Sequence, residues 1–169
     1  MPTKRPSSPE LHAVPVRREV VELTVVAENV ARELTPEALE RDVRIKLRAR
    51  GAAAVLGDPT ELFRALACLV GNSIRHAPRG TTVLLQVEAA SGRALVDVLD
   101  EGAAVAAGLR AVVFQPFFVA SPEQGGLAFT TARNIVHGHG GQIAFVECDF
   151  GHVRVELPLA VDDTPPARN

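Results

Sequence analysis

The strongest pattern of apolar and polar positions along the chain lies between Asp58 and Gly80. Its apolar residues recur every three or four positions and form one face of a helix: Leu62, Leu66 and Leu69, followed by Ser73. Asp58 suits the N-cap of this helix, and Pro59 suits its first position. Because a proline disfavours helical backbone in the residue before it, we expect the helix to stop at Ala77, which precedes Pro78.

A group of polar side chains interrupts the apolar face near the end of this helix. Asn72, Arg75 and His76 lie three to four positions apart and therefore share a face. Taken alone, this pattern admits two interpretations. It is a binding site, or it is a solvated polar patch at the open end of an amphipathic helix.

Shorter patterns on either side predict the other elements. Further helices are expected over 24–41, with a kink or restart after Thr35 because Pro36 follows, and over 127–136. Between Asp100 and Gln124 the sequence favours a loop with a short helix. Apolar runs and alternating residues predict strands over these ranges: 20–23, 43–48, 53–56, 82–88, 93–99, 142–148 and 152–157.

This order of elements predicts an α+β fold. The expected structure is a two-layer α/β sandwich, in which a mixed, mostly antiparallel sheet carries its helices on one face. The chain lacks the regular strand–helix alternation of a Rossmann fold, and it contains no G-x-x-x-x-G-K-[ST] phosphate loop. We expect one folded domain over residues 18–160, between disordered polar tails over 1–17 and 161–169.

Composition narrows the class of protein further. The 169 residues fit one domain, and a hydrophobic share of 47% is enough for a substantial core. A net charge of −2 gives no reason to expect binding to nucleic acid or to an anionic membrane. The cysteines, Cys68 and Cys148, form no CxxC pair, and no apolar run is long enough to span a membrane. These features predict a cytoplasmic protein whose present segment makes no membrane contact.

Four short stretches follow the organising helix in a fixed order. They are VDVLDEG (96–102), VFQPFF (113–118), PEQGGLA (122–128) and HGGQI (139–143). Together with the helix, they resemble the N, G1, F and G2 boxes of the ATP-binding domain of bacterial histidine kinases. That domain belongs to the GHKL superfamily of Bergerat-type fold, which also contains gyrase, Hsp90-type chaperones and MutL. The resemblance runs from about residue 20 to residue 160 and implies ATP and Mg²⁺ as cofactors.

The resemblance assigns roles to particular residues. Asn72 matches the asparagine that holds Mg²⁺, for which a side-chain oxygen is the suitable ligand. Arg75 matches a cation that contacts phosphate, so the resemblance implies that Asn72 and Arg75 are the catalytic residues. Asp100 and Gly102 match the box that binds the adenine amino group. His76 either faces the nucleotide or interacts with the carbonyls at the helix end.

The lid is the second part of the implied site. The backbone N–H groups of Gly125, Gly126 and Leu127, at the start of a helix, are expected to cradle phosphates. The aromatic residues of the stretch 113–118 are expected to pack the lid against the core.

Several positions depart from the family pattern. Cys68 stands where relatives carry Asn or Glu, and a neutral thiol is a poor ligand for Mg²⁺ and a poor base. Ala104 replaces a glycine and would be strained if the site required a positive φ. The other departures lie in the lid: Ser121 for a lysine, and Gln124 and Ala128 for glycines.

Three functions therefore stay open. The first is the catalytic domain of a two-component sensor histidine kinase, which would transfer phosphate from Mg-ATP to a histidine on a partner protein or on a missing segment. Its partners would be a phosphoacceptor histidine protein or a response-regulator pathway protein, with a homodimer as one open arrangement. The second is a degenerate domain, a pseudokinase that acts as a signalling adaptor. The third is a stand-alone serine kinase of the anti-sigma-factor type.

Overall fold

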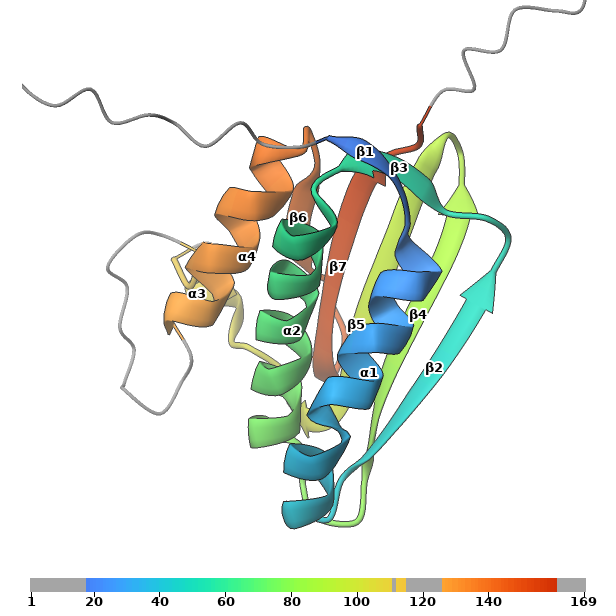
Figure 1. Ribbon diagram of the computed structural model, residues 1–169. Coiled ribbons are helices and arrows are strands. Elements are labelled where there is room, and N and C mark those ends of the chain that lie inside the picture. Colours follow the sequence, from blue (N-terminus) through green and yellow to red (C-terminus); the bar gives the residue numbers. More distant parts are fainter. Residues whose placement is uncertain (1–17, 111, 115–125, 161–169) are drawn as a thin grey trace, which may run out of the picture.

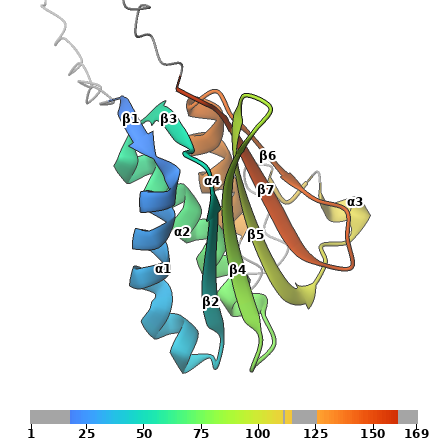
Figure 2. The ribbon, with the colours of Figure 1, turned by 90° about the vertical axis from the view of Figure 1, so that its right-hand side faces the viewer.

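The computed structural model describes residues 18–110, 112–114 and 126–160 of the chain. Within these residues a five-stranded sheet has the strand order β2-β4-β5-β7-β6. Helices α1 (Leu23–Glu40), α2 (Pro59–His76) and α4 (Gly126–Gly138) cover one face of this sheet, and no helix of the described residues covers its other face (Figures 1 and 2). The predicted α+β sandwich with helices on one face is confirmed.

The strands pair in a mixed but mostly antiparallel pattern. Only the edge pair of β2 (Arg44–Arg50) and β4 (Thr82–Ala90) is parallel. The antiparallel pairs join β4 to β5 (Arg93–Ala103), β5 to β7 (Phe150–Pro158), and β7 to β6 (Gln142–Phe145). A separate two-stranded sheet contains β1 (Glu19–Glu22) and β3 (Ala54–Gly57). The short helix α3 spans Ala107–Arg110.

Helix α2 forms as its sequence predicts. The Asp58 carboxylate accepts hydrogen bonds from the backbone N–H groups of Thr60 (2.9 Å) and Glu61 (3.1 Å), which caps the helix. Its leucine row is buried in the core, and Ala77 leaves the helix with extended backbone. The chain therefore turns away directly after the polar group formed by Asn72, Arg75 and His76.

Several predicted boundaries differ from the structure. Helix α1 runs through Pro36 as one helix, so of the kink or restart expected after Thr35 the restart is wrong. Pro36 has no backbone N–H and therefore donates no hydrogen bond within the helix. In the same turn, the Thr35 hydroxyl donates a hydrogen bond to the Ala31 carbonyl (2.7 Å). Strand β6 ends at Phe145 rather than at residue 148, and β7 begins at Phe150 rather than at residue 152. Strand β5 also continues past Asp100 to Ala103, through a register shift in its pairing with β7. The loop predicted to begin after Asp100 therefore begins later, and the end of β5 enters the region of the site.

A buried histidine ties α2 to α4. The His139 ring accepts a hydrogen bond from the Asp58 N–H at Nε2 (3.0 Å), and its Nδ1 lies 2.7 Å from the Ile135 carbonyl oxygen. Only one tautomer satisfies both contacts, with the proton on Nδ1. His139 therefore fixes the start of α2 against the end of α4.

Two further observations complete the fold. Phe114 packs against Phe129 and Phe145 with ring centroids 5.6 and 5.0 Å away, so this residue of the aromatic stretch belongs to the core. The rest of that stretch and the predicted tails lie outside the described residues. Among the helices that the structure describes, none has the length and apolar character needed to cross a membrane.

Candidate functional site

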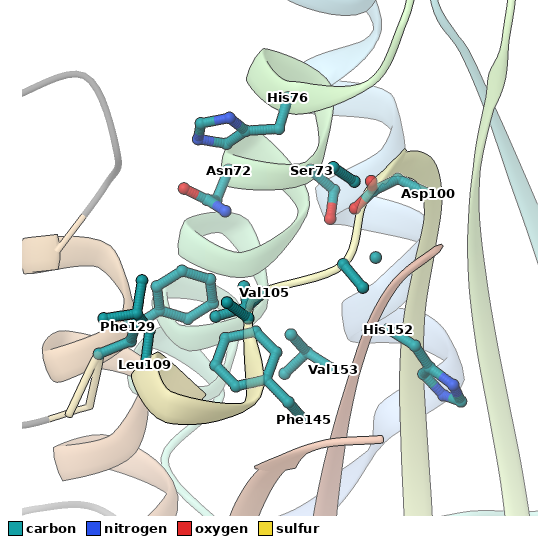
Figure 3. A pocket seen from close by; sticks show the side chains of 15 residues that line it. Asn72, Ser73, His76, Asp100, Val105, Leu109, Phe129, Phe145, His152 and Val153 are labelled. Atoms are coloured by element: carbon teal, nitrogen blue, oxygen red, sulfur yellow. The ribbon is translucent and has the colours of Figure 1, made fainter. Parts of the chain in front are cut away.

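A cavity of about 300 Å³ opens between α2, the end of β5, α3 and α4. Its polar lining comes from Asn72, Ser73, His76 and Asp100, whose side chains Figure 3 shows around one part of it. The opposite part is apolar and includes Val105, Leu109, Phe129 and Phe145. A concave site with a few convergent polar groups on an apolar wall is typical of small-molecule binding.

Asp100 is positioned by the alternation of β5. Val96 and Val98 face the helices, and Asp100 continues the same row, so its carboxylate enters the cavity with only 8% of the residue exposed. One carboxylate oxygen, Oδ1, accepts a hydrogen bond from the Gly102 N–H at 2.9 Å. The other oxygen makes no hydrogen bond with the described residues, which leaves it available to a ligand.

Two glycines make room for the Asp100 carboxylate. A Cβ atom at Gly102 would lie 2.7 Å from Asp100 Oδ1 and 2.8 Å from the backbone oxygen of His76. Gly151, the cross-strand partner of Asp100 on β7, is equally confined, because a Cβ there would collide with the carboxylate. Gly102 was predicted as a site residue. Gly151 was not predicted as a site residue, because it falls between the predicted strands 142–148 and 152–157.

Asn72 presents an unsatisfied oxygen to the site. The residue is 8% exposed, and its Oδ1 is buried with no hydrogen-bond partner in the part of the chain that the structure describes. Buried polar atoms without partners are rare because they cost free energy. A hard cation or a ligand donor at this oxygen would remove the cost. The described residues hold no cluster of three or more His, Cys, Asp or Glu side chains that would form a metal site by itself.

The other predicted site residues divide between the cavity and its surroundings. His76 lines the cavity with an exposed ring. Arg75 does not line it, because its guanidinium lies 3.7 Å from the Glu37 carboxylate of α1. Gly126 and Leu127 begin α4, whose Phe129 lines the cavity, while Gly125 lies outside the described residues.

The departures from the family pattern have different structural consequences. Burial raises the pKa of the Cys68 thiol, against smaller opposing effects from the guanidinium groups of Arg64 and Arg75, so the thiol stays protonated at neutral pH. Ala104 lines the cavity without a positive φ, so the strain considered for it is absent. Ala128 lies half-buried in α4, and the remaining lid departures, at 121 and 124, lie outside the described residues.

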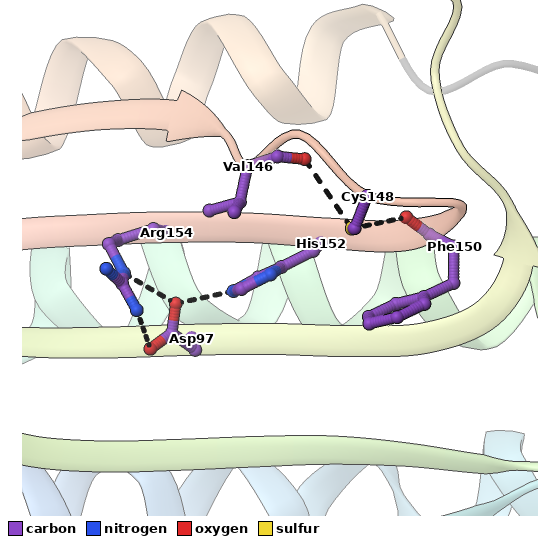
Figure 4. Close-up of polar contacts among 6 residues, drawn as sticks. All are labelled: Asp97, Val146, Cys148, Phe150, His152 and Arg154. Atoms are coloured by element: carbon purple, nitrogen blue, oxygen red, sulfur yellow. Dashed lines mark hydrogen bonds and ion pairs between the residues drawn. The ribbon is translucent and has the colours of Figure 1, made fainter.

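A second polar cluster lies on the opposite face of the sheet (Figure 4). Asp97 is 2% exposed, and its carboxylate accepts hydrogen bonds from Arg154 at 2.8 and 3.0 Å and lies 2.6 Å from the His152 ring. Because Asp97 precedes Val98 in β5, it faces away from the cavity. We interpret this cluster as a cross-strand structural contact between β5 and β7.

Comparison with known proteins agrees with this architecture. Residues 57–161 match the model of the family described as "Histidine kinase-, DNA gyrase B-, and HSP90-like ATPase". The chain is 36% identical over 121 residues to the sensor protein IrlS of Burkholderia pseudomallei, covering 68% of this chain and 26% of that protein. It is 32% identical over 157 residues to the sensor protein kinase PmrB of Pseudomonas aeruginosa, covering 88% and 33%. The chain thus spans about a quarter to a third of these relatives.

Solved structures share the fold. The catalytic domain of the histidine kinase ThkA gives a TM-score of 0.78 at 21% identity, covering 84% of this chain and 95% of that one. The mycobacterial sensor histidine kinase MprB gives a TM-score of 0.74 at 22% identity, covering 84% and 97%. Full-length ShkA, solved in complex with AMPPNP, gives 0.76 at 24% identity, covering 88% and 32%.

The match over residues 57–161 assigns the chain to a class of ATPase domains, and the one-sided sheet agrees with the fold of the solved neighbours. The chain belongs to the histidine kinase-, DNA gyrase B- and HSP90-like ATPase family, and its relatives include a sensor protein, a sensor protein kinase and a sensor histidine kinase.

Proposed function

We propose that this chain is the ATP-binding catalytic domain of a sensor histidine kinase, which supports phosphoryl transfer from Mg-ATP to a histidine on another protein or segment. The observation that carries this proposal is that one cavity brings together two oxygen atoms available to a ligand. The buried Asn72 Oδ1 has no hydrogen-bond partner among the described residues, and only one oxygen of the Asp100 carboxylate accepts a hydrogen bond from them. An adenine amino group and a metal–phosphate group supply the complementary donors and charge.

Each side chain then has a distinct task. Asp100 accepts a hydrogen bond from the adenine amino group, and the cavity's apolar wall contacts the base. Asn72 fits Mg²⁺, because its amide oxygen is a hard ligand and phosphates and waters complete the coordination. When bound, Mg²⁺ neutralises charge on the phosphate oxygens. The N–H groups of the first turn of α4 favour the anionic phosphates.

Arg75 must change partner to contribute. It lies beside Glu37 in the structure, with both side chains 37% exposed. An exposed pair of this kind contributes only about 0–1 kcal/mol, so a triphosphate can displace it. We propose that Arg75 then contacts phosphate, and that His76 lies at the mouth of the nucleotide site.

The identity of the partners follows from this assignment. A phosphoacceptor histidine protein, or the acceptor segment of a longer chain, receives the phosphate, and a response-regulator pathway takes it further. The kinase domains of the sensor relatives motivate this proposal. A cytoplasmic location and a homodimer belong to the same proposal.

A specific observation favours one alternative, a domain that binds nucleotide or a partner protein without fast phosphoryl transfer. No lysine or arginine lines the described cavity, and Arg75 is held by Glu37. Cys68 is also protonated at neutral pH and supplies neither a base nor a ligand for Mg²⁺.

Isothermal titration of the protein with Mg-ATP tests the proposal. We expect micromolar affinity, about −8 kcal/mol, that is strongly weakened in Asn72→Ala and in Asp100→Asn. Arg48→Ala, on the exposed edge strand β2, is the matched control and should bind as the wild type does. No binding at millimolar ATP would refute the proposal. Binding without transfer to any histidine protein would favour the alternative, and an acid-stable phosphoprotein would indicate a serine kinase instead.

A further inference from the structure

We propose that the outer edge of β2 is a docking site for a second protein, which adds an extended segment of alternating acidic and apolar residues to the sheet. β2 is one of the two edge strands of the five-stranded sheet, and Figure 1 shows it at the outer side, beyond β4. No residue of β2 lines the nucleotide cavity, so this inference stands apart from the proposed function.

The outer edge of β2 offers backbone groups for strand pairing. The Arg44 N–H donates to the Thr81 carbonyl (3.0 Å), so the backbone of Arg44 faces β4. Because backbone groups of successive strand residues point to opposite sides, those of Ile45, Leu47 and Ala49 point outward, where the described residues place no strand. β2 pairs with β4 without a register shift and contains no proline. Such an edge is a template for a further strand.

The side chains on the open face of β2 form a basic row, and all four are exposed: Arg44, Lys46, Arg48 and Arg50. No ion pair within the described residues uses any of them. Among the β4 residues opposite the basic row, only Glu88, the partner of Arg50, carries a carboxylate. The described residues therefore leave most of this positive charge without a counterpart.

The alternate side chains of β2 are apolar. Ile45 and Leu47 are half-buried against the core, on the side of the sheet that α1 covers, and Ala49 continues this row. Residues directly opposite each other in paired strands lie on the same face of the sheet. A segment paired with β2 would place acidic side chains beside the basic row and apolar side chains beside Ile45 and Leu47. The two rows therefore specify an alternating acidic and apolar pattern.

The same charges disfavour other occupants. Antiparallel pairing of two copies of β2 would bring their basic rows together on one face, and like charges there are unfavourable. Charged side chains on an edge strand oppose unspecific pairing, and a row of one sign opposes every strand except an acidic one. A nucleic acid would contact the basic row but would leave the outward N–H and C=O groups of β2 unpaired. An acidic polypeptide satisfies both the charges and the backbone.

A labelled peptide tests the proposal on the whole chain. The probe is a fluorescein-labelled heptapeptide of alternating glutamate and valine, and its fluorescence anisotropy is followed as protein is added. We expect its binding to weaken about threefold to tenfold in Arg48→Glu, as the loss and reversal of a cross-strand charge pair predicts. Arg64→Glu makes the same change of charge at an exposed position of α2 and should bind the peptide as the wild type does.

Hydrogen exchange distinguishes strand addition from simple charge attraction. At saturating peptide, the amide hydrogens of Ile45, Leu47 and Ala49 should exchange several times more slowly, whereas those of Lys46 and Arg48, which face β4, should change little. Ala49→Pro removes an outward N–H and no hydrogen bond to β4, so it should keep the melting temperature and weaken peptide binding.

Several outcomes would overturn the proposal. They are no binding at millimolar peptide, equal binding by the wild type and Arg48→Glu, and binding that leaves the exchange of the outward amides unchanged. Tighter binding of polyuridylate than of the peptide would indicate a nucleic-acid surface instead. Each of these results would leave the nucleotide site standing, since titration with Mg-ATP tests that site separately.

Discussion

Gly151→Ala is the substitution whose effect the structure predicts most sharply. Gly151 lies on β7 opposite Asp100, and its φ lies outside the left-handed range, so alanine fits its backbone. The added methyl group would nevertheless occupy the space of the Asp100 carboxylate. Because β7 is paired along its length with β5, the strand cannot easily retreat, and the Asp100 side chain has to move.

The size of the effect follows from the contacts that Asp100 would lose. Its hydrogen bond to the adenine amino group involves an ionised acceptor, and such bonds contribute about 1.5–3 kcal/mol. Loss of this bond weakens binding roughly 10- to 100-fold. The bond from the Gly102 N–H, 2.9 Å long, would also be strained, which lowers the free energy of unfolding by about 1 kcal/mol.

The assay compares Mg-ATP affinity with stability in the same samples. Calorimetry gives the dissociation constant, and urea titration gives the free energy of unfolding. Gly138→Ala is the matched control, because a Cβ there meets nothing within 4 Å. The reasoning is refuted if Gly151→Ala binds Mg-ATP as the wild type does while Asp100→Asn loses binding.

Three other substitutions separate the site from its scaffold. Glu37→Gln removes the partner of Arg75 and should strengthen Mg-ATP binding up to about fivefold without changing adenosine binding, as titrations of both ligands would show. His139→Ala removes the contacts to the Asp58 N–H and the Ile135 carbonyl and leaves a cavity. Urea titration should therefore show a free energy of unfolding lower by about 2–4 kcal/mol, and a decrease below about 0.5 kcal/mol would contradict that role. Asp97→Asn weakens the bidentate contact with Arg154, so it should lower the free energy of unfolding by about 1–3 kcal/mol and leave Mg-ATP affinity unchanged. A large change in Mg-ATP affinity would contradict the assignment of Asp97 to the far face of the sheet.

The fold was predictable because periodicity determines it. The leucine row and the N-cap of α2 specify that helix locally, and alternation in β4 and β5 gives the buried face of the sheet. The errors arose where tertiary contacts override local signals. β5 extends past Asp100 because β7 pairs with it there, and α1 continues through Pro36 because the helix packs on α2 and the sheet on both sides of that residue, through Val30 and Ala38.

The site was only partly predictable from the sequence. Asn72, His76 and Asp100 were named from motif positions, and the structure brings all three to one cavity. Ser73 was read only as a member of the apolar row, and its contact with the cavity became visible only from the geometry. Spacing placed Arg75 on the same face as Asn72, but a side chain that long can reach Glu37 on the neighbouring helix instead. Contacts between α1 and α2 depend on how the two helices pack, and the sequence of neither helix predicts them by itself.

The central claim is that the Asp100 carboxylate accepts a hydrogen bond from the amino group of an adenine nucleotide bound in this cavity. The most direct test titrates the wild type with Mg-ATP and with the magnesium complex of purine riboside triphosphate, which differs only by lacking the 6-amino group. The account predicts micromolar binding of Mg-ATP and binding of the analogue weakened about 10- to 100-fold, the loss expected for one hydrogen bond to an ionised acceptor. Equal affinity for the two triphosphates, or no binding of either at millimolar concentration, would contradict it.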